Sequence, residues 1–258
     1  MKIGIDIGGS HIGVGLVEEN GKIIAKQEKD LLNKEKENIK EIIIETIIQY
    51  VKEITEKNNI DINLIEYVGI AFPKSLRNSK IGKAVNLGIN GFEIEEELKN
   101  KLKIPIYMRN DAKCAAICEK KYGSLKQYKN AVFLSIGTGI GGAAFLDNTL
   151  LGTPKNDLFK IGHITIKKDG IQCKCGKNGC FENYASITAL KREVIKRYNI
   201  SKEITGIELR KIIIENLQDE KMQEILDTYI EDFKVGLSNI INLFEPEAIS
   251  IRRKFCIL

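Results

Sequence analysis

The chain carries a compact group of side chains that could bind a metal ion. Cys173, Cys175 and Cys180 lie close together in the sequence, and His163 precedes the first of them by ten residues. Three thiolates and one imidazole form the ligand set of a tetrahedral Cys₃His zinc site. Because four protein ligands leave no open position, we expect a structural zinc ion rather than a catalytic one. The alternative is a chance grouping of thiols.

Two glycine-rich segments could bind phosphate: Asp6-Ile-Gly-Gly-Ser10 and Gly137-Thr-Gly-Ile-Gly-Gly142. A glycine turn brings bare backbone N–H groups close to an anion. The predicted contacts are Gly8, Gly9, Ser10, Gly137, Thr138, Gly139, Gly141 and Gly142, with Asp6 available for a magnesium ion. Each turn leads into a strand, unlike a Walker loop or a Rossmann fingerprint. The alternative is that both are only tight hairpins.

Three polar residues are candidates for acid–base chemistry and hydroxyl recognition. Asn110 and Asp111 lie between a predicted strand and a predicted helix, so Asp111 could be a general base or only an N-cap. Asn110 can both donate to and accept from a hydroxyl group. Glu182 follows the last cysteine of the cluster by two residues, which would hold it beside His163; by itself it would be a solvated helix start.

The composition restricts the class of protein. The 258 residues are 43% hydrophobic and 29% charged, which is typical of a soluble globular chain with one large or two small domains. The net charge of +5 is too small to favour nucleic acid, and no apolar run approaches the ~20 residues that span a bilayer. We expect a cytoplasmic protein with reduced thiols and no membrane or nucleic-acid partner, in which Cys114 and Cys118 serve core packing.

Hydrophobic periodicity predicts alternating strands and helices. The expected strands are residues 2–8, 12–17, 22–27, 66–72, 104–109, 131–137 and 143–146, and the expected helices are 38–58, 94–102, 112–121, 182–198 and 217–244. Asn20-Gly21 and Asp147-Asn148 are hairpin turns. Because Gly8 and Gly137 occupy equivalent places in two strand–turn–strand patterns, we expect a duplicated fold with domains 1–112 and 113–258.

Taken together, the motifs resemble the ROK family (repressors, open reading frames and sugar kinases), which belongs to the actin/hexokinase-like ATPases. The matching strings are Asp6-Ile-Gly-Gly-Ser10, Asn86-Leu-Gly88, Asn110-Asp111-Ala112, Gly137-Thr-Gly139, Gly162-His163, Cys173-Lys-Cys175-Gly, Gly179-Cys180-Phe-Glu182 and Ala185-Ser186. The similarity extends from Met1 to about Ile251. The zinc knuckle with its preceding Gly-His is the most specific of these features.

The resemblance implies an α/β fold with two lobes of the actin/hexokinase (ribonuclease H-like) type, a cleft, and a zinc knuckle in the second lobe. It implies ATP-dependent phosphorylation of a hexose, with glucose or an amino sugar as substrate. Asp111 would be the general base, while Asn110, His163 and Glu182 would bind sugar hydroxyls and His163 would also ligate zinc. Asp6 would serve Mg²⁺ and the two turns would hold the phosphates of ATP. Family members are often dimers or tetramers, so a homodimer or homotetramer is expected.

The chain departs from the family pattern at two places near the expected sugar site. Leu158-Phe159-Lys160 replaces a family Ala-Gly-Glu, and Pro73-Lys74-Ser75 replaces Pro-Gly-Pro. Lys160 can only donate where a glutamate would accept, so a different sugar or weak activity is expected. The alternative function is a degenerate sugar-binding protein without kinase activity. A transcriptional regulator is disfavoured because the first phosphate strand begins at residue 3, leaving no room for a helix-turn-helix domain.

The third departure concerns the C-terminal end. The family continues after Pro246-Glu247 with a strand, a glycine turn at the adenosine and a helix, whereas this chain ends on Arg252-Arg253-Lys254-Phe255-Cys256-Ile257-Leu258. Codons for that string, read one base later, can encode Gly-Gly-Asn-Phe-Val-Phe. A truncated, frameshifted kinase is therefore a hypothesis that the gene sequence would test.

Overall fold

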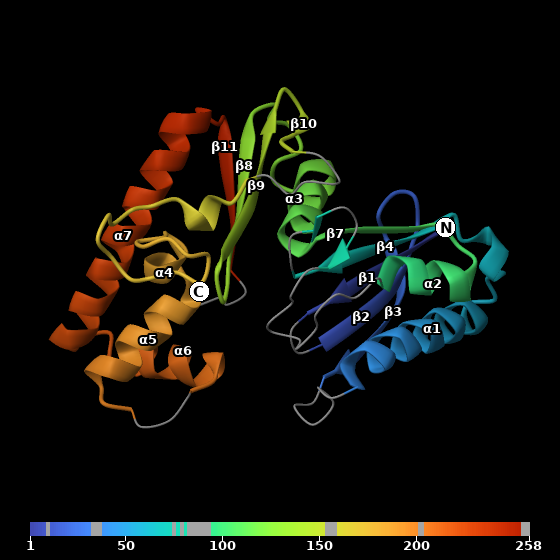
Figure 1. The fold of residues 1–258 in the computed structure, drawn as a ribbon, viewed down its shortest axis with the longest axis horizontal. Helices are drawn as coiled ribbons and strands as arrows, with labels where there is room; N and C mark the ends of the chain where they lie inside the picture. Colours follow the sequence, from blue (N-terminus) through green and yellow to red (C-terminus); the bar gives the residue numbers. More distant parts are fainter. Residues whose placement is uncertain are drawn as a thin grey trace. The chain divides into compact units, whose positions relative to one another are not determined.

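The computed structural model describes residues 1–8, 11–31, 38–73, 76–77, 80–81, 94–152, 159–200 and 204–253. The chain divides into two compact units (Figure 1). Unit 1 comprises Met1–Ala115 with Gly152–Leu158, and unit 2 comprises Ala116–Leu151 with Phe159–Leu258. Each unit has its own sheet and its own hydrophobic core.

Unit 1 is built on a five-stranded sheet with the strand order β3-β2-β1-β4-β7. Its strands are β1 (Lys2–Ile7), β2 (His11–Val17), β3 (Ile23–Asp30), β4 (Tyr67–Phe72) and β7 (Ile106–Asn110). Strands β1, β4 and β7 are parallel, whereas β2 is antiparallel to both β1 and β3. The predicted hairpin at Asn20-Gly21 is confirmed: it joins β2 to β3, and Gly21 has a φ of 88°, which favours glycine.

Helices α1 (Ile39–Lys57) and α2 (Ile94–Leu102) cover this sheet. Helix α1 packs on β2 and β3 and against α2, which also packs on β7 (Figure 1). The predicted apolar stripe of α1 is confirmed, since Ile43, Ile47, Val51 and Ile54 are at most 2% exposed. Burying each such side chain contributes about 1.5–3 kcal/mol, so the stripe fixes the helix on the sheet.

The remaining elements of unit 1 are short or lie at its end. A 3₁₀ helix, η2 (Ile62–Leu64), precedes β4, and β5 (Leu76–Arg77) pairs with β6 (Lys80–Ile81). Strand β7 runs directly into α3 (Asp111–Tyr122), whose first five residues belong to unit 1 and whose remainder, from Ala116, belongs to unit 2. The expected core role of Cys118 on α3 is wrong, because its side chain is exposed; Cys114 is half-buried.

Unit 2 is built on a four-stranded sheet with the strand order β10-β9-β8-β11. The strands are β8 (Ala131–Ile136), β9 (Ile140–Leu146), β10 (Thr149–Leu150) and β11 (Ala248–Arg253). Strand β8 pairs antiparallel with β9 and parallel with β11, just as β1 pairs with β2 and β4 in unit 1. The two sheets therefore repeat one topology, as the spacing of the glycine motifs predicts. The Asp147-Asn148 hairpin is also confirmed, with both residues at positive φ.

The helices of unit 2 are η4 (Ile161–His163), α4 (Glu182–Ala185), α5 (Ile187–Arg197), α6 (Gly206–Glu215) and α7 (Glu220–Phe244). The single helix expected over 182–198 is wrong, because Ser186 has an extended backbone and separates α4 from α5. Its Oγ accepts a hydrogen bond from the backbone N–H of Ala189 at 3.1 Å and caps α5. Helix α6, which periodicity did not predict, begins with a capping box formed by Thr205 and Glu208.

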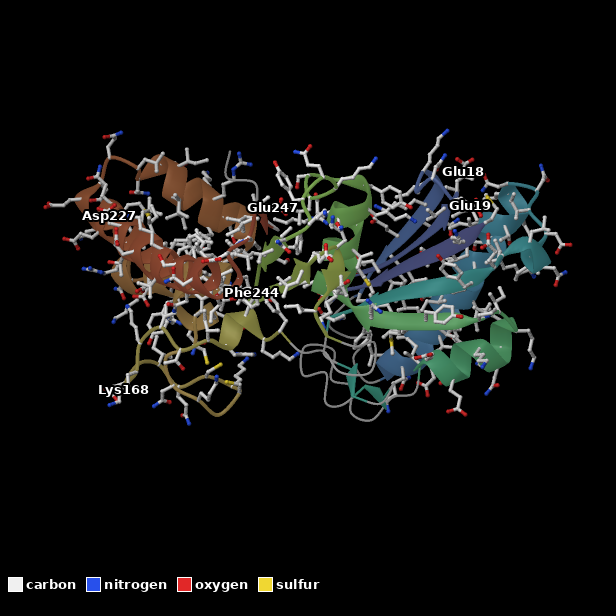
Figure 2. All side chains as sticks on the ribbon, turned by 90° about the horizontal axis from the view of Figure 1, so that it is seen from above. Glu18, Glu19, Lys168, Asp227, Phe244 and Glu247 are labelled. Carbon is white, nitrogen blue, oxygen red and sulfur yellow. The ribbon has the colours of Figure 1, made fainter. Side chains whose placement is uncertain are left out.

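Unit 2 exposes charged side chains away from its core. Lys168, on the cysteine-rich loop between η4 and α4, and Asp227, on α7, are both exposed (Figure 2). Phe244 ends α7 and contacts the ring of Phe159, with 5.2 Å between the ring centroids. None of the described helices has the length and apolar character that a membrane crossing requires.

Candidate functional site

In unit 1, the first glycine segment lies at the carboxyl end of β1, where the side chain of Asp6 is exposed. Asp6 is 61% exposed, and the Gly8 N–H donates to the carbonyl of His11 at 2.8 Å. The imidazole Nε2 of His11 lies 3.3 Å from Asp6 Oδ2. Gly9 and Ser10 lie outside the described residues.

Sequence reasoning did not single out His11. The available signal was its rarity, since the chain has only two histidines and this one directly follows the first glycine segment. Its ring lies so close to Gly8 that a Cβ there would collide with it. Gly8 is therefore required for the approach of this side chain as well as for the turn.

Asn110 and Asp111 lie at the same edge of the unit 1 sheet as Asp6. Asp6 pairs with Ala71 on β4, which in turn pairs with Arg109 on β7, so Asp6 and Asn110 lie at the same end of the two strands that flank β4. Neighbouring strands are about 4.8 Å apart, so the backbones of Asp6 and Asn110 lie about 10 Å apart at the carboxyl ends of parallel strands. Ligands of open α/β sheets bind at this edge.

The capping role that was one alternative for Asp111 belongs to Asn110. Asn110 Oδ1 accepts from the N–H of Lys113 at 3.3 Å, whereas Asp111 is the first helical residue. Asp111 Oδ1 accepts from the Ala112 N–H at 2.8 Å and from Asn110 Nδ2 at 3.0 Å, and the residue is exposed. These donors stabilise its carboxylate and orient it at the helix start.

In unit 2, the four residues expected to bind metal do come together. One ligand atom from each of His163, Cys173, Cys175 and Cys180 lies within 4.8 Å of the other three. The Sγ atoms of Cys175 and Cys180 are 3.5 Å apart, and Cys173 Sγ lies 3.6 Å from His163 Nδ1. Tetrahedral zinc with Zn–S near 2.3 Å and Zn–N near 2.0–2.1 Å separates its ligands by about 3.5–3.8 Å. The cluster therefore fits a zinc ion.

The loop that carries these ligands is shaped by its own backbone. The N–H of Cys173 donates to Lys177 O at 2.7 Å, and Gly176 N–H donates to Cys173 O at 3.0 Å. Gly176 and Gly179 have φ values of 92° and 73°, which glycine adopts without strain. Lys177 Nζ donates to the carbonyl of His163 at 2.7 Å and holds the histidine against the loop.

The thiols titrate unequally in the metal-free protein. Burial raises the pKa of Cys173, and burial together with the neighbouring thiols raises the pKa of Cys180 to about 12. The pKa of Cys175 is lowered, chiefly by a hydrogen bond from the backbone of Lys177. A cation would stabilise all three thiolates, so metal binding must displace protons from the buried pair.

Glu182 links the metal cluster to the second glycine segment. Its Oε1 lies 3.4 Å from His163 Nδ1 and 3.5 Å from Cys173 Sγ. A Cβ on Gly139 would stand 2.7 Å from Glu182 Oε2, so this carboxylate lies directly against the turn. The turn is also tied to the start of α5, since Ile187 N–H donates to Gly137 O at 2.9 Å.

The second glycine segment is shorter than its sequence suggests. Gly137, Thr138 and Gly139 form the turn, with the Gly137 N–H donating to Gly139 O at 2.9 Å. Gly141 and Gly142 lie in β9 and pair with Ser135 and Leu134. Gly142 is required for sheet packing, because a Cβ there would stand 2.5 Å from the carbonyl oxygen of Phe133.

Several residues of the sequence analysis lie outside the described ranges: Lys74, Ser75, Asn86 to Gly88, Leu158 and the segment 254–258. Lys160 is described; it precedes η4 and is exposed.

The chain is similar to both glucokinases and xylose repressors. It is 31% identical over 251 residues to a xylose repressor of Bacillus spizizenii, covering 97% of this chain and 63% of the repressor. It is 30% identical over 263 residues to a glucokinase of Thermotoga maritima, covering 96% and 80% of the two chains. The chain thus spans less than two thirds of the length of that repressor.

A solved structure of a glucokinase is also similar to this chain. The ROK family glucokinase from Streptomyces griseus in complex with glucose and AMPPNP superposes with a TM-score of 0.76 at 26% identity, covering 98% of this chain and 82% of that one. The sequence matches the ROK family over residues 2–254. The chain belongs to the ROK family.

Proposed function

We propose that this protein phosphorylates a glucose-like hexose at the expense of ATP. The observation that carries the proposal is the position of Glu182, whose carboxylate lies against both the Gly139 turn and the His163–cysteine cluster. A residue in this place can bind a polyol beside a phosphate-binding turn. The glucokinase relatives support the same activity.

The proposal assigns Asp111 as the general base. Its carboxylate would accept the proton of the attacking sugar hydroxyl as that oxygen bonds to the γ-phosphorus of ATP, with ADP leaving. Asn110, His163 and Glu182 would hold other hydroxyls of the sugar. Gly8, Gly9, Ser10 and the turn Gly137–Gly139 would donate backbone N–H groups to phosphate oxygens.

Two metal ions belong to the proposal. Asp6, with an exposed carboxylate beside the first turn, would hold Mg²⁺, which supplies charge neutralisation of the phosphates. His163, Cys173, Cys175 and Cys180 would hold a structural Zn²⁺. Ligation through Nδ1 leaves the proton of His163 on Nε2, from which it can donate to a sugar oxygen.

A coupled ADP-release assay over a panel of glucose, fructose, mannose and N-acetylmannosamine tests the activity. We expect turnover with at least one hexose, and Asp111→Asn should abolish it while sugar binding persists. Asp61→Asn is the matched control, since Asp61 caps η2 in the same unit and asparagine caps equally well. An Asp111→Asn variant as active as Asp61→Asn would refute the assigned base.

The zinc assignment has its own measurement. Metal analysis should find about one zinc per chain, and Cys175→Ser should lose it. Cys118→Ser, which changes an exposed thiol outside the cluster, should retain it. Zinc-free wild-type protein would overturn the assignment.

A second candidate function is sugar binding without phosphoryl transfer. The similarity to the xylose repressor favours it, as does Lys160, which donates where a kinase would have an acceptor. Losing one charge-assisted hydrogen bond costs about 1.5–3 kcal/mol, or about 10–150-fold in affinity. A sugar-dependent rise in melting temperature without ADP release from any sugar of the panel would select this function.

A further inference from the structure

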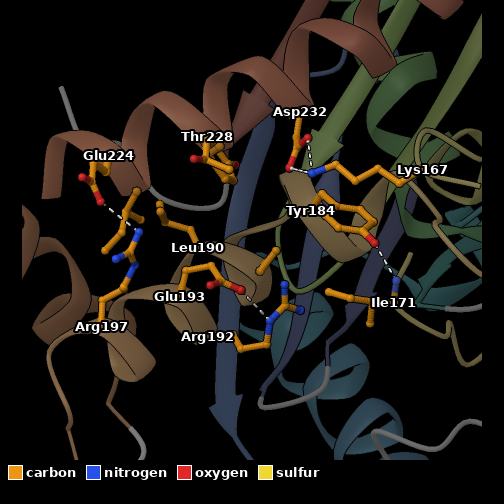
Figure 3. Close-up of a pocket in the computed structure, with 13 residues that line it drawn as sticks. Lys167, Ile171, Tyr184, Leu190, Arg192, Glu193, Arg197, Glu224, Thr228 and Asp232 are labelled. Atoms are coloured by element: carbon orange, nitrogen blue, oxygen red, sulfur yellow. Dashed lines mark hydrogen bonds and ion pairs between the residues drawn. The ribbon is translucent and has the colours of Figure 1, made fainter. Parts of the chain in front are cut away.

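A cavity of about 250 Å³ lies in unit 2 among α4, α5, α7 and the cysteine-rich loop (Figure 3). Three ion pairs form much of its wall: Lys167–Asp232, Arg192–Glu193 and Arg197–Glu224. Every cation of the wall thus has an acid beside it, and the charges cancel. The cavity is therefore better explained by the contacts that build its wall than by a charged ligand.

The pair Lys167–Asp232 differs from the other two in burial and in what it connects. The Asp232 side chain is 11% exposed, whereas the acids of the other pairs are 41% and 54% exposed. Lys167 Nζ reaches both carboxylate oxygens, Oδ1 at 2.7 Å and Oδ2 at 2.8 Å. A carboxylate this deeply buried requires a partner, so the contact is specific.

Lys167 belongs to the loop that presents the metal ligands. Its backbone N–H donates to Gly179 O at 3.3 Å, and its carbonyl packs so tightly on Gly179 that no Cβ fits there. Gly179 immediately precedes Cys180. The backbone of Lys167 thus holds the last cysteine ligand while its side chain holds α7.

The ammonium group of Lys167 also contacts an aromatic ring on α4. It lies 4.6 Å from the ring centroid of Tyr184 on α4, a cation–π contact. The Tyr184 hydroxyl accepts from the Ile171 N–H of the same loop at 2.5 Å. Figure 3 shows the Asp232–Lys167 contact beside the Tyr184 ring. The lysine therefore joins the loop, α4 and α7 at one point.

We propose that Lys167 and Asp232 are positioning residues that clamp the cysteine-rich loop onto α7 and thereby retain the metal bound by His163 and the three cysteines. The inference rests on the proposed zinc site. Without the clamp, the loop between η4 and α4 opens more often, and a chelator reaches the metal during each opening.

The experiment measures zinc transfer from the full chain to a chromogenic chelator. Lys167→Met keeps the aliphatic stem over Tyr184, and Asp232→Asn keeps the shape of the acid. We expect both to release zinc about tenfold faster than wild type, the lower end of what remote partners of metal ligands contribute. Lys167→Arg keeps the charge and should restore slow release.

Two controls separate the clamp from general stability. Arg197→Met breaks the exposed Arg197–Glu224 pair of the same cavity and should leave the release rate unchanged. Ile213→Ala lowers the melting temperature through the hydrophobic cluster of α5, α6 and α7, which contains neither Lys167 nor Asp232, and should also leave release slow. If Lys167→Met folds poorly, Asp232→Asn still tests the clamp. Its zinc-release rate can be compared with that of Ile213→Ala at a similar melting temperature.

Wild-type release rates in both Lys167→Met and Asp232→Asn would overturn the clamp. Fast release from Arg197→Met or Ile213→Ala would overturn it too, since any destabilisation would then suffice. A wild-type chain that binds no zinc overturns the metal assignment and the clamp together, whereas zinc-loaded wild type with slow-releasing variants overturns the clamp alone.

Discussion

Replacing Gly139 by alanine should impair sugar binding without unfolding the protein. Gly139 lies outside the left-handed region, so alanine is tolerated by its backbone. Its new Cβ would stand 2.7 Å from Glu182 Oε2, against 3.4 Å for ordinary van der Waals contact. The carboxylate must therefore retreat by about 0.7 Å, the difference between these distances, or rotate away.

This displacement is enough to weaken the hydrogen bond that we propose between a sugar hydroxyl and Glu182. A hydrogen bond of about 2.8 Å lengthened by such a shift reaches the limit of useful geometry. Loss of a charge-assisted bond costs about 1.5–3 kcal/mol, so the KM for the sugar should rise about tenfold or more. The melting temperature should stay close to that of wild type, because only the end of a flexible side chain moves.

The coupled ADP-release assay, run with Gly139→Ala, Glu182→Ala and the double variant, decides the matter. If alanine acts by displacing Glu182, it should add little once Glu182 is already removed. The reasoning would be refuted if the sugar KM of the double variant were a further tenfold above that of Glu182→Ala. An unchanged sugar KM in Gly139→Ala would also refute it.

Gly142→Ala is the matched control for this prediction. Its Cβ would stand 2.5 Å from the carbonyl oxygen of Phe133 and 3.2 Å from Ile161 Cγ2. The backbone of a paired strand cannot retreat as a carboxylate can, so this variant should lose about 1–3 kcal/mol of stability. Equal melting temperatures for the two variants would contradict the structural distinction between them.

Two further predictions concern the metal cluster and the break between α4 and α5. Burial raises the pKa of Cys173 and Cys180, so both thiols carry protons at neutral pH without metal. The apparent zinc affinity should therefore rise with pH until these thiols ionise, by about tenfold per pH unit for each proton displaced. An affinity that stays constant between about pH 6 and pH 8 in chelator competition would contradict this. Ser186→Ala should lower the unfolding free energy by about 0.5–2 kcal/mol in urea titration, because it removes the cap of α5, whereas Ser186→Asp, which can still cap, should retain more stability.

Local sequence was sufficient for features whose determinants lie within a few residues. The stripe of α1 repeats every three or four residues, and burial of that stripe fixes the helix whichever sheet receives it. The Asn20-Gly21 hairpin follows from the conformational freedom of glycine. The cysteine ligands lie in one short loop, so their spacing alone predicts that they can meet around an ion.

Local helix and strand propensity did not predict the element boundaries where a polar side chain caps a helix. The residues of α4 and α5 have continuous helical character, yet the Oγ of Ser186 satisfies a helix N-terminus and ends the preceding turn. At Asn110-Asp111 the aspartate was a candidate cap, one of two roles left open for it, but the strand continues one residue further and the asparagine caps the helix.

The sequence by itself determined the family, and it indicated which residues could bind a metal ion or act on a sugar, because these are matters of residue type and short spacing. Only the tertiary structure decided which of them meet. Gly139, in the turn before β9, meets Glu182 at the start of α4, and Lys167 meets Asp232 across 65 residues of chain. Such contacts are set by how sheets and helices pack, and no local pattern encodes the partner of a side chain that distant.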